Sequence, residues 1–368
     1  MASGSSSSAS DGSSRISEPD SPIVQMSDDN YFHDLKVVIG LPAVAAGGKD
    51  EMGSKDGDGV VAPANEGQLC IGRNNEWLLC GFCTDQGMRR YMEDRYMIIP
   101  TFLSLGCNTF GGCTAPQCEY AVNMSPVHYF AVFDGHGGWQ ASDYCMKSLH
   151  TALKEAWETA DTTTEWNKKW GSAFFRAYEN VDKACEIETD AGSTALVVLL
   201  SSCQIVAANC GDSRAVLCRG SHTIPLSEDH KPDREDEEER IVKSGGCILS
   251  DEWGTPRVNG VLAMSRAIGD KRLKPAVSAV PDLTFTTRSE DDECLIIATD
   301  GLWDVMSTTC VGNFACQKLQ QERNVERANK SPSQYVAECL HQEARSRSSS
   351  DNFCVIVVDL KSKPPTNP

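Results

Sequence analysis

Short apolar runs that end beside an aspartate are the feature that most constrains how this chain folds. The run "YFAVF" ends at Asp134, and "CLIIAT" ends at Asp300. Three more aspartates border such runs: Asp212 follows "IVAANCG", Asp270 closes "VLAMSRAIG" and Asp351 precedes "NFCVIVV". Runs of this kind are typical of buried β-strands, and a sheet brings strand ends together. We therefore expect these carboxylates to converge, although any one of them alone is an ordinary turn residue.

Converging carboxylates repel one another, so such a site needs cations to neutralise it. We expect few buried basic side chains to be available for that role. Hard divalent ions such as Mg²⁺ or Mn²⁺ prefer carboxylate and carbonyl oxygens, and the glycine after Asp134 leaves its backbone free to turn toward an ion. Two ions about 4 Å apart can activate a water molecule between them.

A second charged segment, "GMRRYMEDRYM", carries further candidate residues. If the segment is extended, Arg89 and Met92 face opposite sides. Arg89 then presents its guanidinium to a phosphate group, while Glu93 or Asp94 reaches the ions or their waters. The alternative is a charged strand on the surface.

Strands and helices alternate along the chain from Trp77 onward. Apolar runs such as "HYFAVFDG" and "NFCVIVVDL" predict strands, and helices are predicted over 139–157, 165–188, 231–246, 303–322 and 332–346. The stretch "GSTALVVLLSSCQIVAANC" predicts two strands joined by a tight turn, which favours antiparallel pairing. The pattern predicts an α+β fold.

One domain is predicted over residues 73–361. Residues 1–72 are rich in Ser, Gly, Asp and Ala and are predicted to be mostly disordered, apart from "LKVVIGLPAVAA", a possible docking segment. Residues 362–368 form a C-terminal tail.

Charge and targeting signals narrow the function classes. The net charge of -18 over 368 residues argues against nucleic-acid and anionic-membrane partners. No run approaches the roughly 18 apolar residues of a membrane helix. The N-terminus lacks the apolar segment of a secretory signal, and Ala2 excludes N-myristoylation. We expect a protein of the cytoplasm, the nucleus or both.

Two groups among the 17 cysteines invite special interpretation. Cys80 and Cys83 form a C-x-x-C motif, but "EWLLCGFC" predicts a strand rather than the helix start of a redox site. Cys107, Cys113 and Cys118 suggest a structural metal site, but their loop offers no clear fourth ligand nearby. We expect reduced thiols in the apolar interior.

Eight segments of the chain occur in a familiar order: "RRYMED", "VFDGHGG", "GSTA", "NCGDSRAVL", "DHKPDREDE", "GVLAMSRAIGD", "ATDGLWDVM" and "SSDN". This order resembles that of the 2C-type, metal-dependent protein Ser/Thr phosphatases and spans residues 76–361. Several of the later segments most resemble the plant branch that acts in abscisic acid signalling. The resemblance implies two packed antiparallel β-sheets flanked by α-helices, with a metal site at one end.

The resemblance also assigns roles to residues of the predicted site. Asp134 matches the aspartate that bridges two metals, and Gly135 supplies a carbonyl ligand. The remaining matches are metal ligands: Asp300 and Asp351 on one ion, Glu93 directly or through water, and Asp212 and Asp270 near a weaker third ion. Arg89 matches the phosphate-binding arginine, and His136 matches the proposed general acid. A metal-bridging hydroxide then attacks phosphorus in line, on a phosphoserine or phosphothreonine of a protein substrate, which includes protein kinases.

Trp253 stands four residues before Arg257, as does the receptor-contacting tryptophan of the hormone branch. The alternative is a tryptophan that packs the flap of any 2C-type phosphatase, and "GTPRVNG" departs from the usual sequence of that branch. The resemblance thus implies a monomeric phosphatase, a negative regulator that abscisic acid receptors contact through Trp253. The competing interpretations are an inactive binding protein of the same fold and a phosphatase that hormone receptors do not regulate.

Overall fold

Two central sheets organise the computed structural model, which describes residues 37–40 (backbone only), 70–71, 79–115, 118, 121–122, 124–161, 165–185, 190–325 and 330–361. The six-stranded sheet has the order β1-β14-β8-β7-β4-β3, formed by Val37–Gly40, Asp282–Thr287, Gln204–Cys210, Ala195–Leu200, Ser125–Phe133 and Arg95–Leu105. The five-stranded sheet has the order β10-β9-β15-β16-β2, formed by His222–Pro225, Arg214–Arg219, Asp292–Ala298, Phe353–Asp359 and Leu79–Asp85.

The two sheets pack face to face because their strands are apolar on both sides. In β7, Leu196 and Val198 point toward the five-stranded sheet, whereas Val197 and Leu199 point toward helices α2 (Gln140–Glu158) and α3 (Trp166–Ala184). This is the two-residue period of a strand buried on both faces. The continuous apolar runs in the sequence therefore mark the central layers of a four-layer fold.

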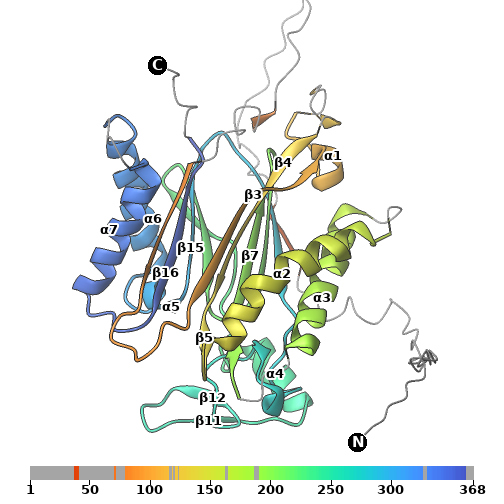
Figure 1. The fold of residues 1–368 in the computed structure, drawn as a ribbon, viewed down its shortest axis with the longest axis vertical. Coiled ribbons are helices and arrows are strands. Elements are labelled where there is room, and N and C mark those ends of the chain that lie inside the picture. Colours follow the sequence, from red (N-terminus) through yellow and green to blue (C-terminus); the bar gives the residue numbers. More distant parts are fainter. Residues whose placement is uncertain are drawn as a thin grey trace, which may run out of the picture. The chain divides into compact units, whose positions relative to one another are not determined.

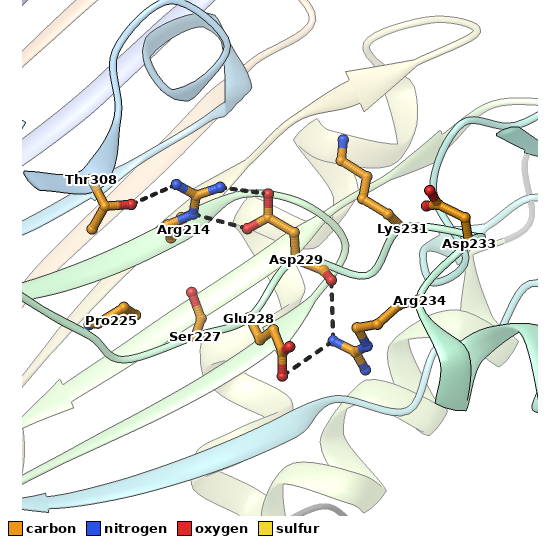
Figure 2. Close-up of a pocket in the computed structure, with 9 residues that line it drawn as sticks. All are labelled: Arg214, Pro225, Ser227, Glu228, Asp229, Lys231, Asp233, Arg234 and Thr308. Carbon is orange, nitrogen blue, oxygen red and sulfur yellow. Dashed lines mark hydrogen bonds and ion pairs between the residues drawn. The ribbon is translucent and has the colours of Figure 1, made fainter. Parts of the chain in front are cut away.

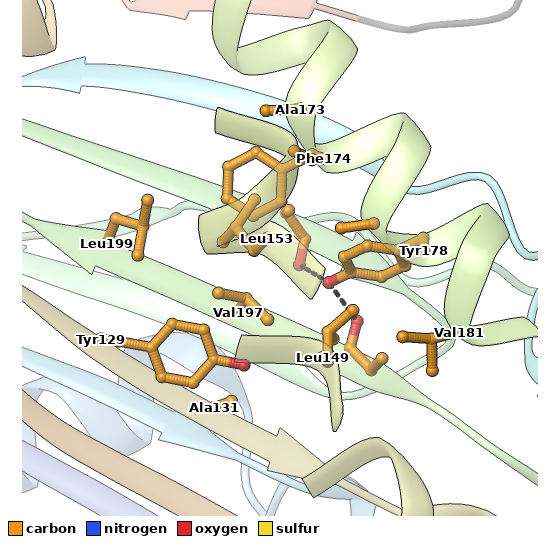
Figure 3. Close-up of a cluster of buried hydrophobic side chains, with 14 of the residues drawn as sticks. Tyr129, Ala131, Leu149, Leu153, Ala173, Phe174, Tyr178, Val181, Val197 and Leu199 are labelled. Atoms are coloured by element: carbon orange, nitrogen blue, oxygen red, sulfur yellow. Dashed lines mark hydrogen bonds between the residues drawn. The ribbon is translucent and has the colours of Figure 1, made fainter. Parts of the chain in front are cut away.

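The helices cover the outer faces of both sheets (Figure 1). Helices α2 and α3 pack on the six-stranded sheet, and Figure 3 shows Tyr178 of α3 reaching into that interface. Its hydroxyl donates to the carbonyl oxygens of Ala195 and Ala208, so the buried polar atom is satisfied. Helices α6 (Thr308–Glu322) and α7 (Pro332–Ser346) cover the five-stranded sheet. The predicted α+β fold of two packed sheets is confirmed.

Helix boundaries follow the capping residues. The helix predicted over 303–322 is divided: the short α5 (Asp300–Trp303) precedes α6, whose N-cap Ser307 accepts a hydrogen bond from the backbone N–H of Cys310. The other predicted helices are present, with α4 (Glu235–Lys243) shorter than its predicted range. The sequence pattern missed the interruption because the apolar residues continue across it.

Within the part of the chain that the structure describes, the strands pair in antiparallel fashion, as predicted, with one exception. Strands β7 and β8 form the expected hairpin, whereas β1 pairs in parallel with β14. Because Val37–Gly40 lie within "LKVVIGLPAVAA", the described part of this segment adds a strand to the six-stranded sheet, upstream of the domain start predicted at residue 73. The rest of residues 1–72, apart from 70–71, and residues 362–368 lie outside the described residues.

Short strands gather at the end of the domain that carries the site (Figure 1). A three-stranded sheet has the order β13-β6-β5, formed by Ile268–Gly269, Gly192–Ser193 and Gly135–His136. A two-stranded ribbon joins β11 (Ile248–Ser250) and β12 (Pro256–Val258). None of the helices described here is both long and apolar enough to cross a membrane.

The C-x-x-C motif lies on strand β2, as the sequence predicts. Cys80 packs into the core between the sheets, and Cys83 packs on the opposite face beside α6 and α7. Burial raises the pKa of Cys83 to about 11. A thiol pair on opposite faces, without a stabilised thiolate, does not suit redox chemistry.

Candidate metal centre

Three of the five strand-end aspartates lie together in the structure. Asp134 follows β4, Asp212 follows β8, and Asp300 begins α5 directly after β15. Each offers a carboxylate oxygen, and these oxygens lie within 4.8 Å of one another. The prediction that strand ends bring carboxylates together therefore holds for these residues.

Backbone contacts fix the position of Asp134. Its N–H donates to Thr194 Oγ1 at 2.9 Å, and its carbonyl accepts from the N–H of Thr194, also at 2.9 Å. Gly301 lets the start of α5 approach the last strand closely, because a Cβ there would lie 2.0 Å from the carbonyl oxygen of Asn352. These contacts hold the end of β4 beside Thr194 and the start of α5 beside Asn352.

The electrostatics of this cluster call for a cation. Burial raises the pKa of Asp134 well above its usual range, and the charges of Asp94 and Asp212 raise it further. Burial likewise raises the pKa of Asp300, with Asp134 adding to the effect. Burial raises the pKa of Asp94 to about 8, although Thr299 donates a hydrogen bond to it at 2.7 Å. The neighbouring positive charges do not neutralise these carboxylates.

The donor set fits a hard divalent ion. Oδ1 of Asp212 is buried, and none of the described residues is hydrogen-bonded to it. Gly135 is required for space, since a Cβ would lie 2.7 Å from the carbonyl oxygen of Glu93 and 2.8 Å from Ser142 Oγ. Clustered carboxylate oxygens with an unused buried lone pair match the oxygen ligands of Mg²⁺ and Mn²⁺.

Arg89 lies at the rim of this cluster, in the turn after β2. Its guanidinium donates to Asp351 Oδ2 at 2.5 Å, while the side chain stays largely exposed. Gly87, with φ of 63°, makes this approach possible, because a Cβ there would lie 2.1 Å from the carbonyl oxygen of Asp351. The hydrogen bond to Asp351 raises the pKa of Arg89, and the charges of Asp300 and Asp134 raise it further. An exposed, permanently charged fork beside the carboxylates suits a phosphate group.

Glu93 is placed by its backbone. Its N–H donates to Asn352 Oδ1 at 2.6 Å, and its carbonyl oxygen accepts from the hydroxyl of Ser142. Asn352 Nδ2 also donates to the carbonyl oxygens of Gln86 and Tyr91. One asparagine therefore fastens the whole "RRYMED" loop to the end of the last strand.

Asp270 does not join the three clustered aspartates but pairs with His136. His136 Nε2 lies 2.8 Å from Asp270 Oδ2, and the Asp270 carboxylate is buried. Gly192 makes room for the pair, since a Cβ there would lie 1.9 Å from that oxygen. The carboxylate fixes the orientation of the imidazole.

A cavity of about 450 Å³ adjoins the cluster through Lys231 (Figure 2). The Lys231 ammonium lies 2.5 Å from Asp212 Oδ2. Burial lowers the pKa of Lys231, but the Asp212 carboxylate outweighs burial and raises it. On the far side, Arg214 and Asp229 form a two-point ion pair, with nitrogen–oxygen distances of 3.0 and 2.8 Å. The cavity is therefore polar and lined by both signs of charge.

Sequence reasoning missed four residues that shape this site. Thr194, Lys231, Asp304 and Asn352 all lie inside motifs that the sequence shows, in "GSTA", "DHKPDREDE", "DGLWD" and "SSDN". Burial raises the pKa of Asp304, and the Asp212 charge raises it further, so this carboxylate belongs to the same electrostatic cluster. Asn352 directly follows the assigned Asp351, whereas the signal for the other three was only that they lie inside these motifs.

Comparison with known proteins agrees with this geometry. Residues 78–353 match the family model "Protein phosphatase 2C". The chain is 41% identical over 317 residues to "Protein phosphatase 2C 53" of Oryza sativa subsp. japonica, covering 77% of this chain and 70% of that one. It is 42% identical over 310 residues to "Protein phosphatase 2C 56" of Arabidopsis thaliana, covering 77% and 68%. The crystal structure of serine-threonine phosphatase 2C from Toxoplasma gondii superposes with a TM-score of 0.62 at 25% identity, covering 77% and 94%.

The chain therefore belongs to the protein phosphatase 2C family. It is a plant 2C-type protein serine/threonine phosphatase, as the order of its motifs indicates. Enzymes of this family are in general metal-dependent, and the clustered carboxylates are consistent with that property.

Proposed function

We propose that this phosphatase removes phosphate from phosphoserine and phosphothreonine at the Asp134–Asp212–Asp300 cluster, with two Mg²⁺ or Mn²⁺ ions bound there. The observation that carries the proposal is the convergence of three carboxylates that have too few basic neighbours to neutralise their charge. Asp134, Gly135, Asp300, Asp351 and Glu93 are the proposed ligands, with Asp94 beside them. Asp212 and Asp270 are proposed to serve a weaker third site. When bound, the ions supply positive charge and an activated water.

The chain's own residues do the rest of the chemistry. Arg89 leaves its pairing with Asp351 to bind two phosphate oxygens, which orients phosphorus toward the carboxylate cluster. The serine or threonine alkoxide is a poor leaving group and needs a proton as the bond to phosphorus breaks. His136 donates that proton, and Asp270 holds the imidazole in position.

A phosphopeptide assay tests this proposal. Purified protein should release phosphate from a phosphothreonine peptide with Mn²⁺ or Mg²⁺, and release should stop in EDTA and return when the ion is restored. The exposed Asp291→Asn variant serves as a matched control and should retain full activity. Equal activity with and without EDTA would overturn the metal mechanism. No activity under any condition would favour an inactive binding protein of the same fold.

We further propose a role as a negative regulator in abscisic acid signalling, controlled by a hormone receptor that contacts Trp253. Trp253 is 84% exposed in the loop between β11 and β12, so it does not pack the flap. The Asp251 carboxylate holds the loop by accepting from the N–H groups of Trp253 and Thr255, both at 2.9 Å. A large apolar side chain fixed in this way is suited to enter a partner's pocket.

Adding an abscisic acid receptor with and without hormone tests the regulatory role. Hormone plus receptor should inhibit the phosphatase, and Trp253→Ala should keep full basal activity but escape inhibition. Val325→Ala, an exposed apolar residue at the end of α6, should still be inhibited. Activity that excess receptor and hormone leave unchanged would exclude this regulation. The substrates are proposed to be phosphoproteins, including protein kinases, met by a monomer in the cytoplasm or nucleus.

A further inference from the structure

Four cysteine thiols gather far from the carboxylates in the fold's topology, beside the turn that joins β7 to β8. The Sγ atoms of Cys70, Cys107, Cys113 and Cys203 lie within 4.8 Å of one another. Cys70, Cys107 and Cys203 are buried, and Cys113 is half-buried. We call this group the four-thiol cluster. Its thiols come from three separate segments of the chain, so a ligand bound to all four would cross-link these segments.

The local backbone is built to bring these thiols together. Cys107 begins the short α1 (Cys107–Phe110), and its carbonyl oxygen accepts from the N–H groups of Gly111 and Gly112. Gly112 has φ of 106°, a conformation that favours glycine, and it turns the chain so that Cys113 comes back toward Cys107. Thr114 Oγ1 then accepts from the N–H of Ile71 at 3.2 Å, which ties the segment of Cys70 to this loop.

The spacing of the thiols is close to that of a tetrahedral zinc site. A Zn–S bond of about 2.3 Å places tetrahedral sulfur atoms about 3.8 Å apart. The Sγ atoms of Cys113 and Cys203 are 3.9 Å apart. Four thiolates at this spacing are the ligand set of a closed, structural zinc site.

A buried arginine supplies the charge that such a site would need around it. Four thiolates and one Zn²⁺ carry a net negative charge. The backbone N–H of Arg288 donates to the carbonyl oxygen of Cys203 at 2.9 Å, and only 4% of Arg288 is exposed. Its guanidinium lies 4.0 Å from the Asp292 carboxylate and also interacts electrostatically with the thiols of Cys203 and Cys70. A buried positive charge in this part of the interior offsets part of the net negative charge of a metal tetrathiolate.

A second group of thiols shows what a site without these features looks like. Cys218, Cys294 and Cys316 also lie within 4.8 Å of one another, between the five-stranded sheet and α6. They are part of an apolar core, and among the described residues no fourth ligand joins them. Three thiols in an apolar core behave as small hydrophobic side chains.

We propose that Cys70, Cys107, Cys113 and Cys203 bind a structural Zn²⁺ ion. The sequence did not favour this because the loop of Cys107, Cys113 and Cys118 lacks a clear fourth ligand nearby. The structure supplies Cys203 from the β7–β8 turn and Cys70 from the segment before the domain, in place of Cys118. Binding displaces the thiol protons and fastens the three segments together. The site is independent of the phosphatase mechanism.

Metal analysis of the full chain tests the site. Protein expressed with added zinc and passed through EDTA at neutral pH should keep about one zinc ion per chain, since a closed tetrathiolate site holds its ion tightly. An organomercurial reagent should release that zinc from the wild-type protein, and Co²⁺ in its place should give the visible absorption of a tetrahedral cobalt thiolate. These measurements need no variant, so they remain decisive if a cysteine variant fails to fold.

Variants then assign the ligands. Cys203→Ser should lose the zinc, whereas Cys118→Ser, Cys316→Ser and Asp134→Asn should keep it. Wild-type protein without zinc, or with a disulfide between Cys113 and Cys203 instead, would overturn the proposal. Zinc retained in folded Cys203→Ser, or lost in Asp134→Asn alone, would also overturn it, the latter because it would place the ion at the carboxylates.

Discussion

Two groups of buried carboxylates in this domain have opposite electrostatic surroundings. Glu237 of α4 and Asp282 of β14 are surrounded by arginines, whereas Asp134, Asp300 and Asp94 are surrounded mainly by one another. The first group forms an ion network in which each carboxylate is paired with at least one arginine. Among the residues that the structure describes, the second group has positive partners only in Arg89 and Lys231 at its edge, through Asp351 and Asp212.

The arginine network shows how this fold neutralises an acid that serves structure. Glu237 accepts from Arg266 at 2.6 and 3.0 Å and from Arg240 at 2.8 Å, and Ser265 adds a hydroxyl donor at 2.5 Å. Burial alone raises the pKa of Glu237, but the bonds from Arg266 and Arg240 lower it well below its usual range. The network links α4 to the segment that leads to Asp270.

Without a bound cation, the charges of the acidic cluster are not balanced. Burial pushes the pKa of both groups upward, and only the first has the cations to reverse it. A chain able to place three arginines around Glu237 leaves Asp134 and Asp300 without any comparable partner among the described residues. This contrast is the physical argument for divalent ions at the second group.

Replacing a carboxylate in the incomplete group should abolish activity without loosening the fold. Asp134→Asn should lower phosphopeptide turnover at least about a thousandfold, since a catalytic metal supplies several kcal/mol and each 1.4 kcal/mol is tenfold. In EDTA the variant should melt at a higher temperature than the wild type, because one repelling buried charge is gone. Steady-state kinetics and thermal melting measure the two effects.

Asp291→Asn is the matched control for this variant, because Asp291 is an exposed aspartate beside a strand end. It should change neither quantity. Wild-type turnover in Asp134→Asn would show that this carboxylate is no ligand, and a lower melting temperature in EDTA would contradict the repulsion argument.

The same type of change in the arginine network should have the opposite effect on stability. Glu237→Gln leaves Arg266 without its main partner, and breaking a buried ion pair costs about 3–5 kcal/mol of unfolding free energy. Urea unfolding in EDTA measures it. Glu239→Gln, an exposed residue on the same helix, should stay near the wild-type value. If both variants unfold alike, the network is not a stabilising one.

Much of the fold was readable from the sequence because its strands are buried on both faces. The runs around Val132 and Ile296 are apolar without interruption, which fixes strands, and the tight turn at Ser201–Ser202 predicts an antiparallel hairpin. The parallel pairing of β1 was not readable, since four apolar residues far upstream carry no information on their partner strand.

The candidate site was partly readable for the same reason. Asp134, Asp212 and Asp300 follow apolar strands, so their convergence follows from sheet geometry. Asp270 follows the two-residue strand β13 and itself adopts the left-handed conformation, with φ of 49°, and no sequence rule shows that it turns toward His136. Contacts between distant segments, such as Asn352 with Glu93, become visible only when the strands are paired.

Asp282, the second carboxylate of the arginine network, allows the comparison to be tested by changing the pH. Burial raises the pKa of Asp282, but the His230 imidazole, with Nε2 3.2 Å from Asp282 Oδ2, and the charge of Arg266 lower it to about 2. A carboxylate whose pKa is depressed on folding contributes stability above its unfolded pKa near 4, and this contribution is lost as pH falls from 4 toward 2. The shift from 3.8 to about 2 corresponds to about 2 kcal/mol at pH 5 and above. Urea unfolding of the wild type and Asp282→Asn in EDTA should show that difference at pH 6 and a clearly smaller one at pH 3. A difference that is the same at both pH values would mean that the Asp282 contribution is packing rather than charge.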